Sequence, residues 1–140
     1  MHLGRTLATC SSAAMKFFAL IALPLPAFSL PATAADTVET ADWQWSGAAE
    51  SAASLHTERS GNRIRFDLEL NRGAPSYNSG IASGEFTLND YLGIYQTPDY
   101  PKCVLVFVFL EDAVQIGQVG SGADCGFGYG VMARQVLRRK

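Results

Sequence analysis

The sequence predicts an all-β domain: a small antiparallel meander of about eight strands, closed into a barrel or folded as a sandwich, with one disulfide. Three features predict it. Apolar residues recur with a period of two along much of the chain. Turn-forming Gly, Asn, Asp and Pro residues separate these short runs. Two cysteines, Cys103 and Cys125, lie after the first 35 residues, which have the pattern of a secretory leader.

The first 35 residues have the pattern of a cleaved secretory signal peptide. Lys16 precedes an apolar run over 17–25, and a stretch of small residues ends at Ala35. Prolines interrupt the apolar run, and it is shorter than the ~20 residues that a membrane-spanning helix needs. We therefore expect residues 1–35 to be removed during secretion.

The mature protein is expected to be a single β domain, residues 36–140, in the periplasm or outside the cell. Met15 is an alternative start to Met1, because "MKFFALIALPLP" is already a complete leader opening. No later segment is long and apolar enough to span a bilayer, so no transmembrane anchor is expected after cleavage.

Charge disfavours a nucleic-acid partner. Two of the 11 Lys and Arg residues and none of the 13 Asp and Glu residues lie in the leader, so the mature net charge is −4. Binding to a phosphate backbone requires clustered basic residues, and the only cluster is the terminal run 138–140. A solvated chain end explains this run.

The clearest strand is "RIRFDLEL" (63–70), in which Ile64, Phe66, Leu68 and Leu70 alternate with charged residues. This is the pattern of a strand with one face buried. The turn signal "SGNR" stands before it, which makes "SLHTER" its hairpin partner.

The remaining strands follow the same reasoning. A second hairpin joins "GEFTL" to "YLGIY" across "ND", and residues 48–54 fit a helical turn as an alternative to a strand. "CVLVFVFL" (103–110) is apolar throughout, which predicts a strand buried on both faces or central in the sheet. "VMARQVL" (131–137) fits the closing strand. Inward side chains are expected at Trp43, Trp45, Ile64, Phe66, Leu68, Phe86, Leu88, Tyr95, Val104, Val106, Phe107, Phe109 and Ile116. These large side chains leave little room for a large ligand cavity.

Cys103 and Cys125 are expected to form a disulfide, because the mature chain enters an oxidising compartment. The chain-entropy description gives such a bridge roughly 3 kcal/mol of stabilisation. The motif "GFGYG" (126–130) follows the second cysteine. A dinucleotide fingerprint needs a third glycine where Val131 stands, so we interpret the motif as a tight turn or bulge, with Phe127 and Tyr129 on the same side.

Catalytic groups are scarce. His56 is the single histidine after the leader, and both cysteines are assigned to the disulfide, so no metal site, cofactor or Cys-His nucleophile is expected. Asp67 and Glu69 form a carboxylate pair on the outward face of their strand. Arg63 and Arg65 share that face, so surface ion pairing explains the two carboxylates. No catalytic residue is assigned.

Exposed aromatic residues are the more informative candidates. Tyr77, Tyr91, Tyr100 and Tyr129 all lie at or near predicted loops. Such tyrosines are either half-buried surface residues or, if they gather at one end of the barrel, a rim that binds a partner.

The last third, "CVLVFVFLEDAVQIGQVGSGADCGFGYGVMARQVLRR", resembles a loose group of small secreted proteobacterial proteins. These show a cysteine-led strand, a turn, a second strand, Cys-Gly-x-Gly and a closing strand, and "WSG" and "GEFTLNDYLGIY" fit the pattern. The group is similar in general look to periplasmic lysozyme-inhibitor-type small β-barrels. Leu137 stands where the group tends to have tyrosine, and no inhibitor loop matches residue by residue, so no family site is carried over.

These features predict a non-enzymatic periplasmic or secreted protein that binds a protein partner, with inhibition of a cell-wall hydrolase as the candidate role. One alternative is a small-ligand carrier, with Trp43, Trp45 and the tyrosines lining a barrel mouth. A second alternative is a hydrolase that uses Asp67 or Glu69.

Overall fold

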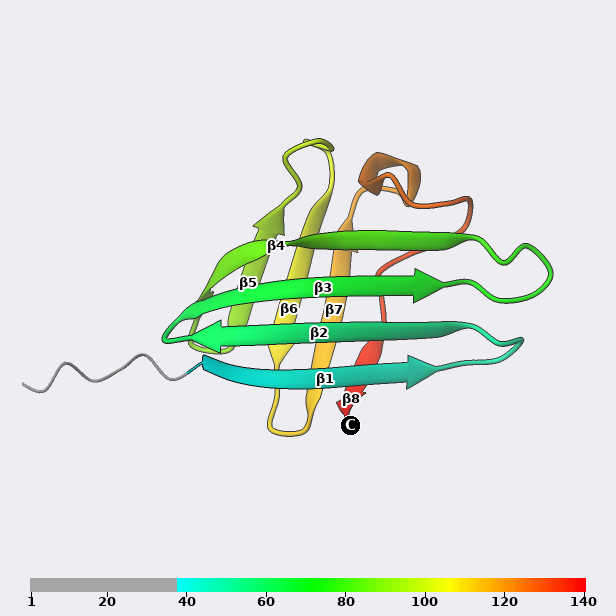
Figure 1. Ribbon diagram of the computed structural model, residues 1–140. Helices are drawn as coiled ribbons and strands as arrows, with labels where there is room; N and C mark the ends of the chain where they lie inside the picture. Colours follow the sequence, from blue (N-terminus) through cyan, green and yellow to red (C-terminus); the bar gives the residue numbers. More distant parts are fainter. Residues whose placement is uncertain (1–37) are drawn as a thin grey trace, which may run out of the picture. The chain divides into compact units, whose positions relative to one another are not determined.

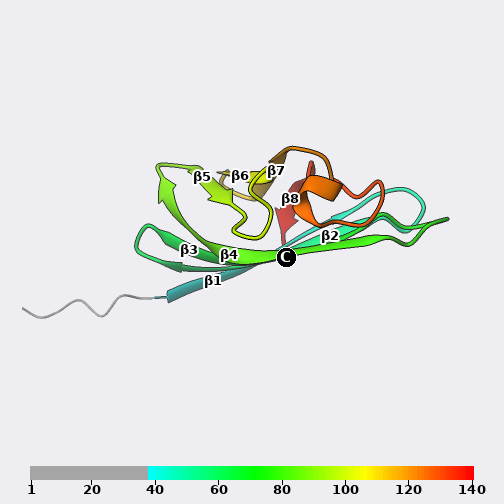
Figure 2. The same ribbon diagram turned by 90° about the horizontal axis from the view of Figure 1, so that it is seen from above.

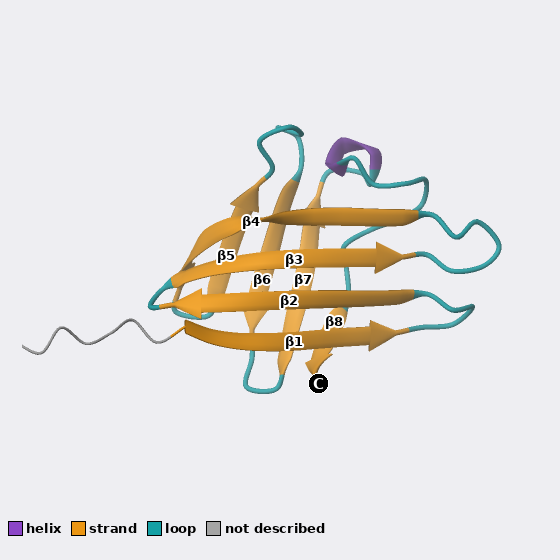
Figure 3. Cartoon of the chain, viewed as in Figure 1, coloured by secondary structure: helices purple, strands orange, loops and turns teal. Residues whose placement is uncertain are grey.

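The computed structural model describes residues 38–140, which form eight strands and one short 3-10 helix (Figure 3). The elements are β1 (Val38–Ser46), β2 (Ala52–Ser60), β3 (Arg63–Asn71), β4 (Ser79–Asn89), β5 (Leu92–Gln96), β6 (Val104–Phe109), β7 (Ala113–Val119), η1 (Ala123–Cys125) and β8 (Val136–Arg139). Each strand pairs antiparallel with the next, and β8 pairs with β1. The predicted all-β barrel is confirmed, while the predicted leader, residues 1–35, lies outside the described residues.

The barrel is flattened into two layers. In Figures 1 and 2, β1–β4 form one layer and β5–β8 cross behind it, with β4 curving from the first layer into the second. Because the chain is a simple meander, successive connections alternate between the two ends of the barrel. The β1–β2, β3–β4, β5–β6 and β7–β8 connections therefore share one end, and the other three share the opposite end.

Aromatic side chains fill the middle of the barrel around Phe66, which is completely buried. Its ring centroid lies 4.9 Å from that of Phe107 and 5.0 Å from that of Tyr95. Phe86 stacks on Phe107 at 4.9 Å. Gly93 on β5 makes this possible, because a Cβ there would overlap the Phe86 ring. The middle of the barrel is packed with side chains rather than hollow.

The phase predicted for β6 was wrong at Val104 and Val106. The fully buried residues of this strand are Leu105 and Phe107, and the valines lie on the outer face, half-buried. A strand presents alternate residues to opposite faces, so Phe107 and the two valines cannot all point inward. The run carries no polar residue to mark its outer side. The strand is therefore buried on one face, not on both. It is central in the sheet, the other predicted alternative, because it pairs with β5 and with β7.

The closing strand is shorter than predicted, since β8 spans Val136–Arg139 and residues 131–135 form no strand. Side-chain amides bind the backbone of this segment instead. The Gln118 Oε1 accepts from the Ala133 N–H at 2.7 Å, and the Gln135 Nε2 donates to the Met132 carbonyl at 2.8 Å. Glutamine side chains thus form hydrogen bonds with backbone groups that would otherwise pair with a neighbouring strand.

The two layers differ in the chemistry of their outer faces. The outer face of β1–β4 carries charged residues, including the arginines and carboxylates of β3. The outward positions of β5, β6 and β7 carry none, and they expose apolar side chains such as Ile94 and Val119. Val119, the last residue of β7, is thus an exposed apolar residue on this uncharged face.

Candidate binding rim

Three loops and one tyrosine form what we call the rim: residues 47–51, 72–78 and 126–130, with Tyr100. They belong to connections that share one end of the barrel, at the right and the top of Figure 1. Residues 48–54, which fitted either a strand or a helical turn, divide between the first of these loops and the start of β2.

The loops 47–51 and 72–78 hold each other. The Ala74 N–H donates to the Ala49 carbonyl at 2.8 Å, and the Tyr77 hydroxyl donates to the Glu50 carboxylate at 3.1 Å. Ala49, Glu50 and Tyr77 have positive φ angles of 54°, 62° and 49°. Among the described residues Asp90 is the only other non-glycine residue with this conformation. Such conformations cost about 1–3 kcal/mol each and are typical of loops with a function.

Tyr129 is the most exposed aromatic residue of the described chain, with 85% of its surface accessible. Its backbone is nevertheless held, because its carbonyl accepts from Asn78 Nδ2 at 2.8 Å and from Arg72 Nη1 at 3.2 Å. The Arg72 guanidinium also lies 5.8 Å from the centre of the Tyr129 ring. Gly130 has a φ of 76°, and a Cβ there would collide with this guanidinium. The ring is therefore presented to solvent from a fixed base.

Phe127 and Tyr129 lie on opposite sides of the turn, contrary to the prediction. Phe127 is buried, and a Cβ on Gly80 would lie 2.7 Å from its ring, so the missing side chain on β4 makes room for it. Phe127 thereby anchors the loop to the core, and Tyr129 points to solvent. The predicted tight turn itself is confirmed at Gly126 and Gly130, whose φ angles are 71° and 76°.

The disulfide Cys103–Cys125 is confirmed, with a Cα–Cα distance of 4.9 Å and both residues buried. It joins the start of β6 to η1. The Cys103 N–H donates to the Tyr100 carbonyl at 2.8 Å, and the Tyr100 ring covers Gly126, where a Cβ would overlap it. The disulfide therefore fixes Tyr100 next to the 126–130 loop.

Tyr91 does not join the other three predicted tyrosines. It lies in the β4–β5 turn, at the opposite end of the 11-residue strand β4 from the 72–78 loop. Its carbonyl accepts from the Phe109 N–H at 2.8 Å. The structure thus gathers Tyr77, Tyr100 and Tyr129 and leaves Tyr91 apart, with 62% of its surface exposed.

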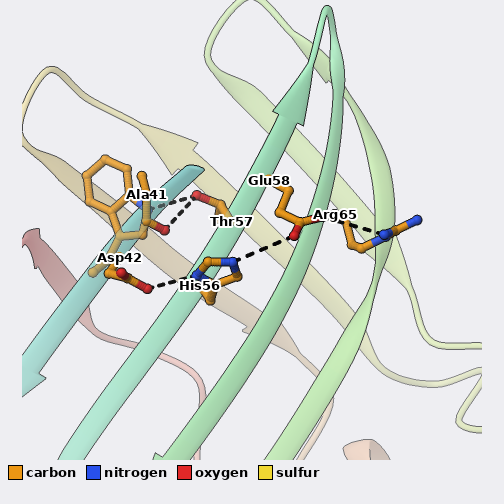
Figure 4. Close-up of polar contacts among 7 residues, drawn as sticks. Ala41, Asp42, His56, Thr57, Glu58 and Arg65 are labelled. Atoms are coloured by element: carbon orange, nitrogen blue, oxygen red, sulfur yellow. Dashed lines mark hydrogen bonds and ion pairs between the residues drawn. The ribbon is translucent and has the colours of Figure 1, made fainter. Parts of the chain in front are cut away.

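His56 lies on the outer face of β2 in an exposed ion network (Figure 4). Its Nδ1 is 2.8 Å from Asp42 Oδ1, and its Nε2 is 3.9 Å from Glu58 Oε1. The hydrogen bond to Asp42 raises the pKa of His56 above 6.5, and the same bond lowers the pKa of Asp42 below 3.8. Both ring nitrogens thus face carboxylates, and in the described chain His56 has no serine, threonine or cysteine as a hydrogen-bond partner.

The carboxylate pair has different neighbours from those predicted. Arg63 pairs with Glu85, and Arg65 lies 3.5 Å from Glu58. Asp67 and Glu69 take part in no ion pair within the described chain. In residues 38–140, no group of three or more His, Cys, Asp or Glu side chains is placed to hold a metal ion.

The two tryptophans do not line one mouth with the tyrosines. Trp43 is buried, and its indole N–H donates to the Thr57 hydroxyl at 3.1 Å. Trp45 is half-buried and covers Gly47 at the rim end of β1. The two tryptophans and the four tyrosines therefore do not gather at one opening, as the carrier alternative had placed them.

Sequence reasoning missed Glu50, Arg72 and Asn78, the residues that hold Tyr77 and Tyr129. They stand in polar loops, where composition gives no sign of a partner. Gly130 could have indicated this contact from the sequence. A glycine next to an aromatic residue is consistent with the close approach of another group, here the Arg72 guanidinium.

Comparisons of the chain with protein-family models, with curated proteins and with solved structures give no match. Among the described residues, no helix has the length and apolar character required to cross a membrane. A functional proposal for this protein therefore has to come from its own residues.

Proposed function

We propose that this protein is a non-enzymatic binding protein of the periplasm or the extracellular space, which binds a protein partner through the rim. A cell-wall hydrolase is the candidate partner, and inhibition is the candidate effect. One observation carries the proposal: Tyr129 is almost fully exposed while Asn78 and Arg72 fix its backbone.

Tyrosine and arginine are enriched at protein interfaces, where a few such side chains provide most of the binding energy. Tyr129, Tyr77 and Arg72 supply these residue types within one set of contacting loops. Because the loops are held by hydrogen bonds and a disulfide, little conformational entropy is lost when a partner orders them. The rim therefore has the composition and the rigidity of a binding surface.

The location is proposed from two features. Residues 1–35 have the pattern of a cleaved leader, and the disulfide fits an oxidising compartment. A periplasmic or secreted protein of this kind meets cell-wall hydrolases directly. Expression of the full chain, followed by cell fractionation and N-terminal sequencing, tests the location and the cleavage after Ala34 or Ala35.

The partner class is tested with purified hydrolases. Binding of the protein to c-type and g-type lysozymes and to a peptidoglycan amidase is measured by calorimetry, and lysis of cell walls is followed in parallel. The proposal predicts saturable binding to one of these enzymes and a matching loss of lysis. Lysis by the purified protein alone, with no binding to any of the enzymes, would contradict it.

A further inference from the structure

The end of the barrel opposite the rim holds an apolar pocket with a volume of about 210 Å³. We call it the distal pocket and define it by Trp43, Ile64, Leu88, Phe109 and Leu110. The first three side chains are buried in the core, and Leu110 is 53% exposed in the β6–β7 turn. The pocket therefore runs from the aromatic core to the surface.

Small residues leave this space open. Ala41 and Thr57 face the interior between Trp43 and the barrel mouth, and they also line the pocket. The Trp43 indole donates to the Thr57 hydroxyl at 3.1 Å, which donates to the Ala41 carbonyl at 3.2 Å. These polar atoms thus satisfy one another, and the floor of the pocket offers a ligand apolar surface.

Charged residues surround the opening. Arg59 and Arg139 line it, and Glu39 and Glu111 lie there too. The Arg139 guanidinium is 5.5 Å from the centre of the Trp43 ring. The Arg59 Nε donates to the Gly61 carbonyl at 2.9 Å, which leaves its terminal amino groups available to bind a ligand.

Neither arginine belongs to any of the ion pairs within 4.0 Å that residues 38–140 make. A guanidinium with free terminal N–H groups matches the two oxygens of a carboxylate. The two glutamates balance the formal charge of the two arginines, so the opening suits one negative charge better than a phosphate dianion.

We propose that the distal pocket binds a small monocarboxylate, with its apolar body in the pocket and its carboxylate at Arg59 and Arg139. A volume of about 210 Å³ equals that of about seven water-sized groups at ~30 Å³ each. The seven-carbon tail of octanoate has this size. This site is independent of the rim and of any protein partner.

Octanoate is the probe, and Trp43 is the reporter. The chain has two tryptophans, so Trp45→Phe leaves Trp43 as the single tryptophan emitter. Titration of this variant with octanoate should give a saturable change in emission. 1-Octanol lacks the negative charge, and octylammonium reverses it. Both should bind at least about tenfold more weakly than octanoate. Calorimetry on the unsubstituted protein provides the same comparison without the variant.

Three variants, one of them a control, locate the site. Leu110→Ala should weaken octanoate binding by about fivefold, because it removes apolar surface at the opening. Val119→Ala truncates an exposed apolar residue that lies outside the pocket and should leave the affinity unchanged. Arg59→Gln combined with Arg139→Gln should abolish the preference for octanoate over 1-octanol. Absence of saturable binding, octylammonium binding as tightly as octanoate, or equal effects of Leu110→Ala and Val119→Ala would overturn the proposal.

Discussion

Asn78 holds Tyr129 in place: its Nδ2 donates to the Tyr129 carbonyl at 2.8 Å, across 51 positions of the chain. The bond joins the 72–78 loop to the 126–130 loop. It therefore orders the most exposed aromatic side chain of the described protein without covering it.

Asn78→Ala should loosen the 126–130 loop more than it destabilises the barrel. A single hydrogen bond of this kind contributes about 0.5–1.5 kcal/mol to the free energy of unfolding. Hydrogen exchange at the Gly128 amide, which donates to the Ser79 carbonyl, should become faster. Asn62→Ala, in the β2–β3 turn at the opposite end, is the matched control and should leave this exchange rate unchanged. Unaltered exchange in Asn78→Ala would show that the bond does not order the loop.

Loss of the disulfide should destabilise the fold and release Tyr100. Replacing both Cys103 and Cys125 with serine should lower the free energy of unfolding by roughly 3 kcal/mol, as measured by urea denaturation. Mass spectrometry of the native protein before and after reduction should show a gain of about two hydrogens, as expected for one S–S bond. Two free thiols in the native protein would contradict the structure.

Gly93→Ala should destabilise the barrel by about 1–3 kcal/mol, because the added methyl group would collide with the Phe86 ring in a packed core. Gly117→Ala is the matched control on β7, where the nearest atom to the added Cβ is Val106 Cβ at 3.8 Å. The control should change the free energy of unfolding little. Equal effects of the two substitutions would argue against the close packing of Phe86 on β5.

The His56–Asp42 pair should give a pH-dependent contribution to stability. The pKa of His56 is raised, so its contribution is complete below pH 6.5 and is lost as the pH rises through the higher folded-state pKa. The pKa of Asp42 is lowered, so its contribution is present above pH 3.8 and is lost as the pH falls through the lower folded-state value. The pair therefore stabilises the folded protein most between about pH 3.8 and pH 6.5.

An NMR titration of His56 checks this relationship. Asp42→Asn should bring the pKa of His56 down, because the hydrogen bond to Asp42 is the largest cause of the shift. Glu58→Gln should lower it less, since Glu58 acts only through its charge. If Glu58→Gln lowered the pKa of His56 more than Asp42→Asn does, the hydrogen bond to Asp42 would not be the main cause of the shift.

The sequence was sufficient for the parts of the fold that carry a polar marker. In β3 the charged residues alternate with Ile64, Phe66 and Leu68, so the buried face followed directly. In β6 every residue is apolar, and the phase was misplaced at Val104 and Val106.

The candidate site was harder to predict from the sequence than the fold, because it is formed by contacts between loops that are distant in the chain. Connections of a meander alternate between two ends, so counting strands alone separates Tyr91 from Tyr77, Tyr100 and Tyr129. The hydrogen bond from Asn78 to Tyr129 could not be foreseen, because it joins loops that meet only in the folded barrel. Residues 131–135 likewise fitted a strand by sequence. In the structure the Gln118 side chain of β7 and the Gln135 side chain of the segment itself bind its backbone.

The rim is tested most directly by comparing two exposed tyrosines at opposite ends of the barrel. The affinity for the hydrolase found in the inhibition assay is measured by calorimetry for Tyr129→Ala and for Tyr91→Ala, both checked for an unchanged melting temperature. We predict that Tyr129→Ala weakens binding by about 30-fold, as expected for an interface residue contributing ~2 kcal/mol, and that Tyr91→Ala has no effect. Equal effects, or a larger loss with Tyr91→Ala, would contradict a partner bound at the rim.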